Sequence, residues 1–170
     1  MTWLKTQTQT KKGSSLRRAN GFSLIELLIV VAIILIIAAI AIPNLLRSRM
    51  AANEAATSQN MRTIITAEAA YSTTYGIGFS TTLADLGNMA GPLGPLAADL
   101  IESDLALGTK SGYTYTYVST PAVAGIIYDY KLNTDPIGVG TTGQRHFYTD
   151  QTGVIRQNTA AVAGPGDPPI

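Results

Sequence analysis

The chain has 170 residues, of which 46% are hydrophobic and 14% charged, and it contains no cysteine and a single histidine, His146. This length suits one domain with a modest core, and the composition argues against a disordered or nucleic-acid-coating chain. The lack of cysteine excludes disulfides, thiolate metal sites and cysteine nucleophiles, and one histidine excludes His-rich zinc sites and most Ser/His triads.

Charge is distributed unevenly along the chain, although 12 Lys and Arg nearly balance 11 Asp and Glu. Five basic residues precede the first acid, Glu26. They are Lys5, Lys11, Lys12, Arg17 and Arg18. Residues 22–170 therefore keep seven bases against 11 acids, a net charge of −4. This sign argues against phosphate attraction, and hence against nucleic acid as the main partner.

Residues 27–42 form an uninterrupted apolar run, LLIVVAIILIIAAIAI. Twelve of these sixteen residues are Leu, Ile or Val, which together favour membrane insertion by roughly 4 to 7 kcal/mol. A carboxylate at the membrane centre costs about 2.5 to 3.5 kcal/mol, and Glu26 lies near one end, where the cost is smaller. We therefore predict a single membrane span, with the basic N-terminus held in the cytoplasm by the positive-inside rule.

Residue patterns around this run leave two interpretations open. In a plain signal anchor, Ser23 and Glu26 have the spacing of a capping box at the start of the helix. In a secretory signal peptide, the segment Ala39-Ile40-Ala41 would be an A-x-A-like cleavage site. Cleavage there would release a soluble protein, such as a monomeric binding module.

A third interpretation comes from the residues before the apolar run. The segment Lys11–Gly21, KKGSSLRRANG, followed by FSLIELL at Phe22–Leu28, resembles the class III signal of type IV prepilins and type II secretion pseudopilins. The resemblance covers roughly residues 17–46, and we favour this interpretation over the other two.

The resemblance implies roles for four residues. In the family, a membrane aspartyl peptidase cuts after the glycine, here Gly21, and methylates the new N-terminus, here Phe22. Glu26 is implied as the carboxylate used in assembly, where it meets the Phe22 amine of a neighbouring subunit, and Pro43 as a helix-loosening proline. Because breaking a buried ion pair costs about 3 to 5 kcal/mol, against about 1 or less for a pair in water, burial would make this contact selective.

The resemblance also implies an α+β, type IV pilin-like fold, with a long N-terminal helix packed on a small antiparallel sheet of about four strands. The expected function is that of a structural subunit, polymerised through its apolar helix into a type IV pilus-like filament, with a type II secretion pseudopilin as the alternative. It is not expected to be an enzyme or to hold a cofactor or metal. Expected partners are identical or homologous pilin subunits, prepilin peptidase, inner-membrane assembly machinery and, before assembly, membrane lipid.

The expected segments follow from these assignments. A leader, 1–21, is cleaved; residues 22–46 form the transmembrane and assembly half of the helix; residues 47–170 form a periplasmic or extracellular head. The parts of the head are a helix spine 47–75, a loop 76–112, a sheet 113–157 and a tail 158–170. The expected location is the bacterial inner membrane before assembly and a pilus or periplasmic filament afterwards. The chain lacks the cysteine-closed C-terminal loop of many pilins.

Residues 22–75 contain no glycine and one proline, Pro43, which predicts one long helix. Charged residues from Arg47 to Glu54 are expected to mark its exit into water. Apolar and polar residues at helical spacing then form a stripe that can pack on a sheet. The stripe consists of Thr57, Met61, Ile64, Ile65, Tyr71 and Tyr75. Apolar residues in the following loop are expected to be partly buried, either against the spine or against neighbouring subunits; they are Met89, Leu93, Leu96, Leu100 and Ile101.

After Gly112 the hydrophobic period changes to two, which predicts strands. The predicted strands begin at Tyr113, with Tyr115 and Tyr117 on the same face, and continue with Ile126–Leu132, Arg145–Asp150 and Val154–Gln157. The tyrosines could form an exposed stacking platform, but aromatic residues on a half-buried strand usually pack on the helix behind it. The tail from Asn158 to Ile170 has no periodicity and is predicted to be an extended surface segment.

Other polar residues have an ordinary structural interpretation. Asp129, Asp135 and Asp150 could supply oxygen ligands for calcium, but acidic turn residues are the favoured explanation because aspartate is common in turns. His146 lies in a predicted strand, with no nucleophile turn anywhere in the chain, and is expected to be structural. No phosphate-binding, dinucleotide-binding or metalloprotease motif occurs.

Overall fold

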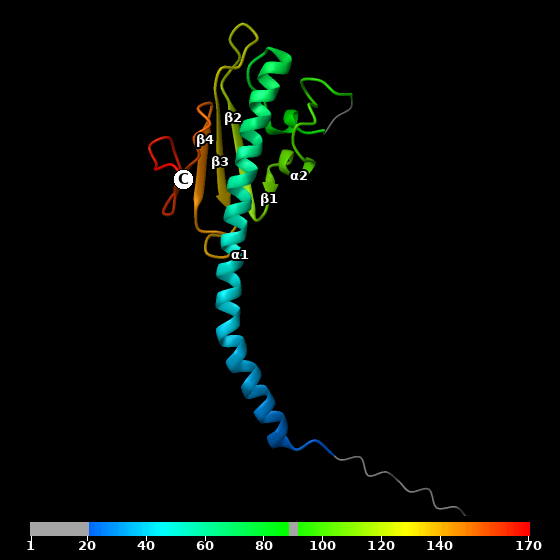
Figure 1. Ribbon diagram of the computed structural model, residues 1–170, viewed down its shortest axis with the longest axis vertical. Helices are drawn as coiled ribbons and strands as arrows, with labels where there is room; N and C mark the ends of the chain where they lie inside the picture. Colours follow the sequence, from blue (N-terminus) through cyan, green and yellow to red (C-terminus); the bar gives the residue numbers. More distant parts are fainter. Residues whose placement is uncertain (1–20, 89–91) are drawn as a thin grey trace, which may run out of the picture. The chain divides into compact units, whose positions relative to one another are not determined.

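The computed structural model describes residues 21–88 and 92–170, in two units that adjoin in the sequence between Ile40 and Ala41. The basic residues before position 21 and Met89 lie outside the described residues. The elements in chain order are α1 (Leu24–Tyr75), η1 (Leu83–Leu86), α2 (Ser103–Ala106), β1 (Thr109–Lys110), β2 (Tyr113–Ser119), β3 (Tyr130–Pro136), β4 (His146–Asp150) and β5 (Arg156–Asn158) (Figure 1).

The long helix α1 begins and ends close to where the sequence predicts. It is continuous through Pro43. After Tyr75, Gly76 adopts φ 67°, and its N–H donates to the Ser72 carbonyl at 3.0 Å. A left-handed residue with such a bond is the usual end of a helix, and glycine adopts that conformation without strain.

In the first unit, over residues 21–40, α1 is apolar on all sides. Every Leu, Ile and Val from Leu24 to Ile40 is exposed. Among the described residues, α1 is the one helix long and apolar enough to cross a membrane, judged by length and composition. A helix that is hydrophobic all round requires cover from lipid or from other protein.

The second unit contains a five-stranded antiparallel sheet with the order β1-β2-β3-β4-β5. In the central register, Thr134 of β3 lies opposite Tyr115 on one side and Phe147 on the other. The α+β class is confirmed, and the sheet has one strand more than the four predicted. The extra strand β1 has only two residues, too few for a periodicity to reveal it.

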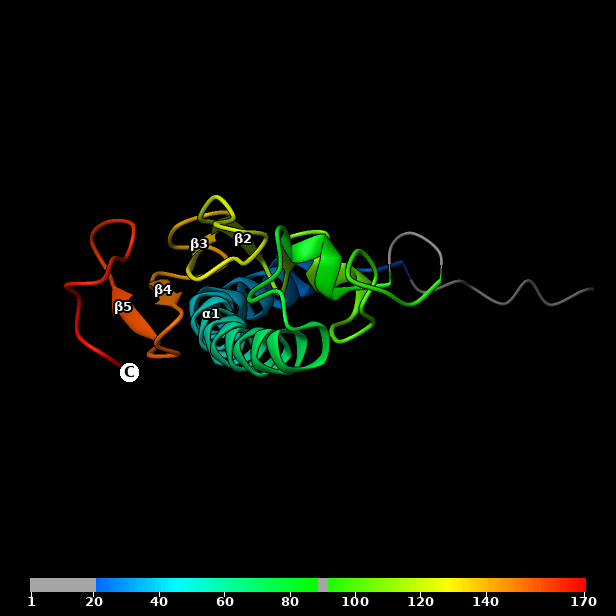
Figure 2. The ribbon, with the colours of Figure 1, turned by 90° about the horizontal axis from the view of Figure 1, so that it is seen from above.

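The buried core lies between the second half of α1 and one face of the sheet. Figure 2 shows the sheet beside α1, with β5 toward one edge and the segment after α1 toward the other. Large apolar side chains that meet in the core include Met61, Ile64, Tyr71, Tyr113, Tyr130, Leu132 and Phe147. The tyrosines of β2 point into this core: Tyr113 and Tyr115 are buried, and Tyr117 is half-buried. The core interpretation is confirmed over the exposed platform.

The second predicted strand is shifted by four residues. The pattern predicted Ile126–Leu132, whereas β3 covers Tyr130–Pro136. Tyr128, predicted to share a face with Tyr130, is 57% exposed. Because the partner strand β2 ends at Ser119, opposite Tyr130, residues 126–129 have no strand to pair with in the ladder.

The segment between α1 and β1 is only partly buried within the chain. It contains η1 and α2, and Ile101 is buried while Leu100 is 37% exposed. Leu93 and Leu96, however, are 70% and 72% exposed within the chain, so they do not pack against the spine, and their burial against neighbouring subunits stays a prediction. Tyr71 of α1 holds the segment in place by donating its hydroxyl to the Pro95 carbonyl at 2.8 Å.

The C-terminal segment is fastened to the sheet and is not simply an extended surface tail. Ala163 is buried, and the Gln157 N–H donates to the Pro168 carbonyl at 3.0 Å. Asp167 closes the segment on itself, because its carboxylate accepts from Asn158 Nδ2 at 3.0 Å and from the Gly164 N–H at 2.8 Å. The bonds from Gln157 and Asn158 join β5 to the segment that follows it.

Candidate assembly site

The residues with predicted processing and assembly roles lie at the start of α1. Gly21 and Phe22 precede the helix and are exposed. The backbone N–H of Ser23 donates to Glu26 Oε2 at 2.9 Å. This contact is the glutamate half of the predicted capping box, in which a carboxylate satisfies a free N–H at the start of a helix.

Glu26 is the one charged side chain from Gly21 to Leu46. Its Oε2 accepts the Ser23 N–H of the same chain, whereas its Oε1 has no hydrogen-bond partner among the described residues. A carboxylate oxygen on an otherwise apolar helix is a strong acceptor for a cation, since a charge-assisted bond is about twice as strong as a neutral one. Glu26 is therefore chemically suited to receive an amine from outside the chain.

Pro43 lies inside α1, at the start of the second unit. Its ring nitrogen carries no hydrogen, so it removes one backbone hydrogen bond from the helix. The structure gives the position of Pro43, and its predicted helix-loosening role stays a prediction.

Glu54 does not mark the exit of α1 into water, as the sequence led us to expect. It is 9% exposed, and its Oε2 accepts from Arg145 Nε at 2.7 Å. Its Oε1 accepts from the backbone N–H of Gln144 at 2.8 Å and of Arg145 at 3.2 Å. Burial alone would raise the pKa of Glu54, but these N–H groups and the guanidinium outweigh it and hold the pKa below its ordinary value.

Glu68 is a second acid on the buried side of α1, with an exposure of 0%. Its two oxygens accept from the Ser80 hydroxyl at 2.6 Å and from the Ser80 N–H at 3.0 Å. The Tyr117 hydroxyl completes the network by donating to the Ser80 carbonyl at 3.0 Å. Burial raises the pKa of Glu68, and the hydrogen bonds from Ser80 offset this only in part.

The spacing of these two acids could have revealed them from the sequence. The buried positions of α1 recur every three or four residues. They are Glu54, Thr57, Met61, Ile64, Glu68 and Tyr71, with Ala67 beside them. The predicted stripe contained four of these residues and left out both acids, because an ionisable side chain is rarely buried without a partner.

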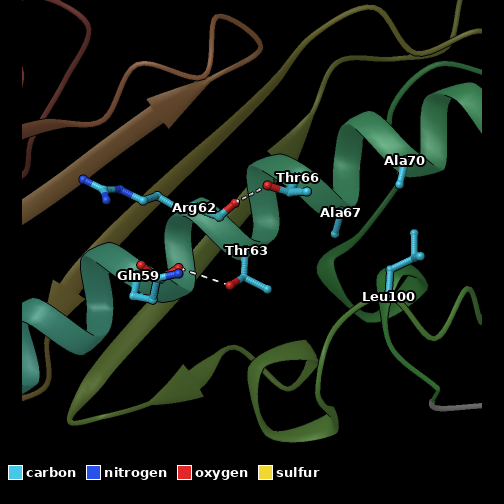
Figure 3. Close-up of a pocket in the computed structure, with 7 residues that line it drawn as sticks. All are labelled: Gln59, Arg62, Thr63, Thr66, Ala67, Ala70 and Leu100. Atoms are coloured by element: carbon cyan, nitrogen blue, oxygen red, sulfur yellow. Dashed lines mark hydrogen bonds between the residues drawn. The ribbon is translucent and has the colours of Figure 1, made fainter.

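The exposed face of α1 in the second unit carries a shallow groove of about 310 Å³ (Figure 3). It is lined by Gln59, Arg62, Thr63, Thr66, Ala67, Ala70 and Leu100. Thr63 and Thr66 turn their hydroxyls back to the helix and donate to the carbonyls of Gln59 and Arg62, at 3.2 and 2.9 Å. Another protein surface could cover these hydroxyls without leaving their hydrogens unpaired.

The acids considered for calcium are separated into different local contacts. Asp135 Oδ1 lies 2.6 Å from His146 Nδ1 across the β3–β4 pair, which gives His146 a structural partner. Asp150 accepts from the N–H and hydroxyl of Thr152 in the following turn. Over residues 21–88 and 92–170, no three acidic or histidine side chains lie close enough to hold a metal ion.

Comparisons with known proteins match the N-terminal part of the chain. The family model described as the prokaryotic N-terminal methylation motif matches residues 16–42. A stretch of 39 residues is 64% identical to the type IV wide pilus major component PilA4 of Thermus thermophilus. A stretch of 54 residues is 44% identical to the type IV major pilin protein PilA of Myxococcus xanthus.

These similarities cover limited parts of each protein. The first match spans 23% of this chain and 30% of the relative, and the second spans 32% and 24%. No solved structure matches the chain. The resemblance of the N-terminal segment to the type IV pilin superfamily is confirmed by both the motif and the relatives.

Proposed function

We propose that this chain, which carries the N-terminal methylation motif of the type IV pilin superfamily, is a structural subunit of a type IV pilus-like filament. The observation that carries the proposal is the exposure of every Leu, Ile and Val from Leu24 to Ile40, in a helix whose one charged side chain before Arg47 is Glu26. Such a surface needs a membrane and then a bundle of like helices.

In this proposal the chain first crosses the inner membrane once, with residues 1–21 in the cytoplasm. Prepilin peptidase removes this leader after Gly21 and methylates Phe22. Residues 22–46 then serve as the transmembrane and assembly half of α1, and residues 47–170 form the head outside the membrane. The inner-membrane assembly machinery moves the processed subunit from lipid into the growing filament.

Burial of apolar surface drives this assembly, because helices that leave lipid pack against one another in the filament centre. The Phe22 amine created by cleavage pairs with Glu26 of a neighbouring subunit, whose Oε1 has no partner among the described residues. Since a buried carboxylate without a cation is costly, the pair sets the axial register of each new subunit.

A pilus is favoured over a type II secretion apparatus because both named relatives are pilus components. A pseudopilin remains the alternative with the same N-terminal chemistry. The proposed partners are identical or homologous subunits, and the proposed role of the chain is structural and not enzymatic.

Intact mass measurement of the protein from membranes and from sheared surface filaments tests the proposal. We expect a chain that begins at Phe22 and carries one added methyl group, together with filaments visible by electron microscopy that contain it. A mature N-terminus near Ile42 would instead support the secreted monomeric module. An unprocessed chain that stays in the membrane would support the plain signal anchor.

A further inference from the structure

The loop between β2 and β3 ends in a rigid, uncharged tip, formed by residues 122–126. Val123 and Ile126 exchange two backbone hydrogen bonds, of 2.9 and 3.1 Å. Ala124 and Gly125 between them adopt φ values of 52° and 82°, which is the geometry of a tight two-residue turn. Val123 is 64% exposed, and no charged residue occurs from Ser119 to Tyr128.

Contacts at its base hold the tip in position. The Ile127 N–H donates to the Ile77 carbonyl and the Phe79 N–H donates to the Ile127 carbonyl, both at 3.0 Å. Gly78 lies so close to Ile127 that a side chain at this position would overlap with the Ile127 backbone. The tip is therefore fixed to the chain that follows α1, so its burial against a partner would require little ordering.

The opposite end of the sheet carries an open groove of about 450 Å³. It is lined by Leu46, Arg49, Asn53, Ser111, Gly112, Thr141 and Thr142. Two exposed apolar side chains, Ile137 and Val139, belong to the β3–β4 loop that forms one wall. This loop is also fixed, because Asn53 Nδ2 donates to the Thr142 carbonyl at 2.8 Å.

The tip and the groove cannot meet within one chain. They are joined by β3, Tyr130–Pro136, and lie at its two ends, as Figure 1 shows for the loops that precede and follow this strand. Seven residues of strand span about 20 Å. A contact between the tip of one copy and the groove of another joins two different surfaces, and repetition of such a contact produces an open series.

The charges at the two ends are complementary. Arg47 and Arg49 lie at or beside the groove and form no ion pair within the described residues. At the end of the sheet that carries the tip, two acids, Asp129 and Asp150, outnumber the one base, Lys131, and none of the three forms an ion pair within the described residues. A head-to-tail arrangement brings the acidic end of one copy toward the basic end of the next, whereas tip-to-tip contact would bring like charges together.

We propose that the tip at 122–126 seats in the groove of the next copy of this chain, so that the heads stack head to tail. The proposal rests on the proposed filament, to which it adds a second contact outside the apolar helices. The occupant of the groove is the same chain, because a filament subunit must offer two different surfaces that fit one another. Both surfaces are held in position by hydrogen bonds, and the basic groove lies at the end of the sheet opposite to the acidic end that carries the tip.

The lack of natural cysteine makes the contact testable by cross-linking. The variant Val123→Cys/Val139→Cys places one thiol on the tip and one beside the groove. Sheared filaments treated with a short bismaleimide should yield a ladder of covalent multimers of the full processed chain. The matched control is Val123→Cys/Val162→Cys, because Val162 is exposed to a similar extent, 59% against 63% for Val139, and lies in the C-terminal segment away from the groove.

A ladder from the first pair without one from the control supports the contact. Filaments that give no ladder, or equal ladders from both pairs, overturn it and leave the filament proposal standing. If the double variant does not assemble, the single variants Val123→Cys and Val139→Cys are mixed as minor components into unmodified filaments. Cross-linked dimers should then require both singles, and their absence from the mixture refutes the contact. Failure of the unmodified chain to form filaments refutes the proposed function instead.

Discussion

Glu54 and Arg145, 91 residues apart in the sequence, form an ion pair in which Arg145 Nε lies 2.7 Å from Glu54 Oε2. The same carboxylate accepts the backbone N–H groups of Gln144 and Arg145. One acid of α1 thus fixes the β3–β4 loop, which also forms a wall of the groove that we assign to the next copy. The stability of this loop should depend on the charge of Glu54.

The variant Glu54→Gln should destabilise the head at neutral pH by about 2 kcal/mol, the usual scale for hydrogen bonds to a charged group. Because the folded pKa of Glu54 is lowered, its contribution is present above its unfolded pKa, roughly 4.3, and is lost as the pH falls through the folded value. Denaturant unfolding of the full chain in detergent at several pH values measures this. An unchanged difference between the two proteins at neutral and strongly acidic pH would contradict the prediction.

Glu68→Gln should show the opposite pH dependence. The folded pKa of Glu68 is raised by burial, so the natural protein loses stability as the pH rises from its unfolded pKa, roughly 4.3, through the folded value. The variant should lack this loss, because its amide is neutral and the Ser80 hydroxyl can rotate to accept from it. The same unfolding series provides the measurement. A natural protein whose stability relative to the variant increases over this range would refute the assignment.

Gly143→Ala should destabilise the head by about 1 to 3 kcal/mol through overpacking. An added methyl group would overlap with the hydroxyl and ring of Tyr113, which is fully buried and donates its hydroxyl to the Arg145 carbonyl at 2.9 Å. The control is Gly164→Ala, where no atom lies within 4 Å of the added carbon. Thermal unfolding should separate the two variants, and equal melting temperatures would argue against a tightly packed Tyr113.

Much of the fold follows from sequence periodicity, since the long run without glycine gives α1 and the alternating tyrosines of β2 face the core. The missed features depend on contacts distant in sequence. The position of β3 depends on where its partner strand β2 ends. The residues around Tyr128 give no sequence signal for that end. The spacing places both acids on the buried face of α1, but the burial of Glu54 requires Arg145 and that of Glu68 requires Ser80, and these partners are known only once the sheet and loops are placed.

Gly21→Ala should block processing without affecting the fold. Gly21 lies before α1, has no atom within 4 Å of an added Cβ and does not have a positive φ that would favour glycine. Any effect of the methyl group therefore arises at the peptidase and not in the folded chain. We expect the unprocessed mass to accumulate in membranes. The head should keep the unfolding midpoint of the natural protein, and normal cleavage of the variant would count against the assignment of Gly21.

Glu26→Val should leave membrane insertion intact and strongly reduce filament assembly, because the neighbouring Phe22 amine would be buried without an anion. Carbonate extraction measures insertion, and recovery of sheared filaments measures assembly. Ser23→Ala is the matched control, since it keeps the backbone N–H that donates to Glu26 at 2.9 Å. We expect Ser23→Ala to assemble better than Glu26→Val. Normal filaments from Glu26→Val would refute the proposal that Glu26 sets the axial register.

The C-terminal segment is closed by Asp167, whose carboxylate accepts from Asn158 and Gly164 and whose carbonyl accepts from Arg156. Since no thiol takes part in this closure, maturation of the head requires no oxidising enzyme and leaves no mispaired sulfur to repair. The fold is thereby indifferent to reductants in its surroundings.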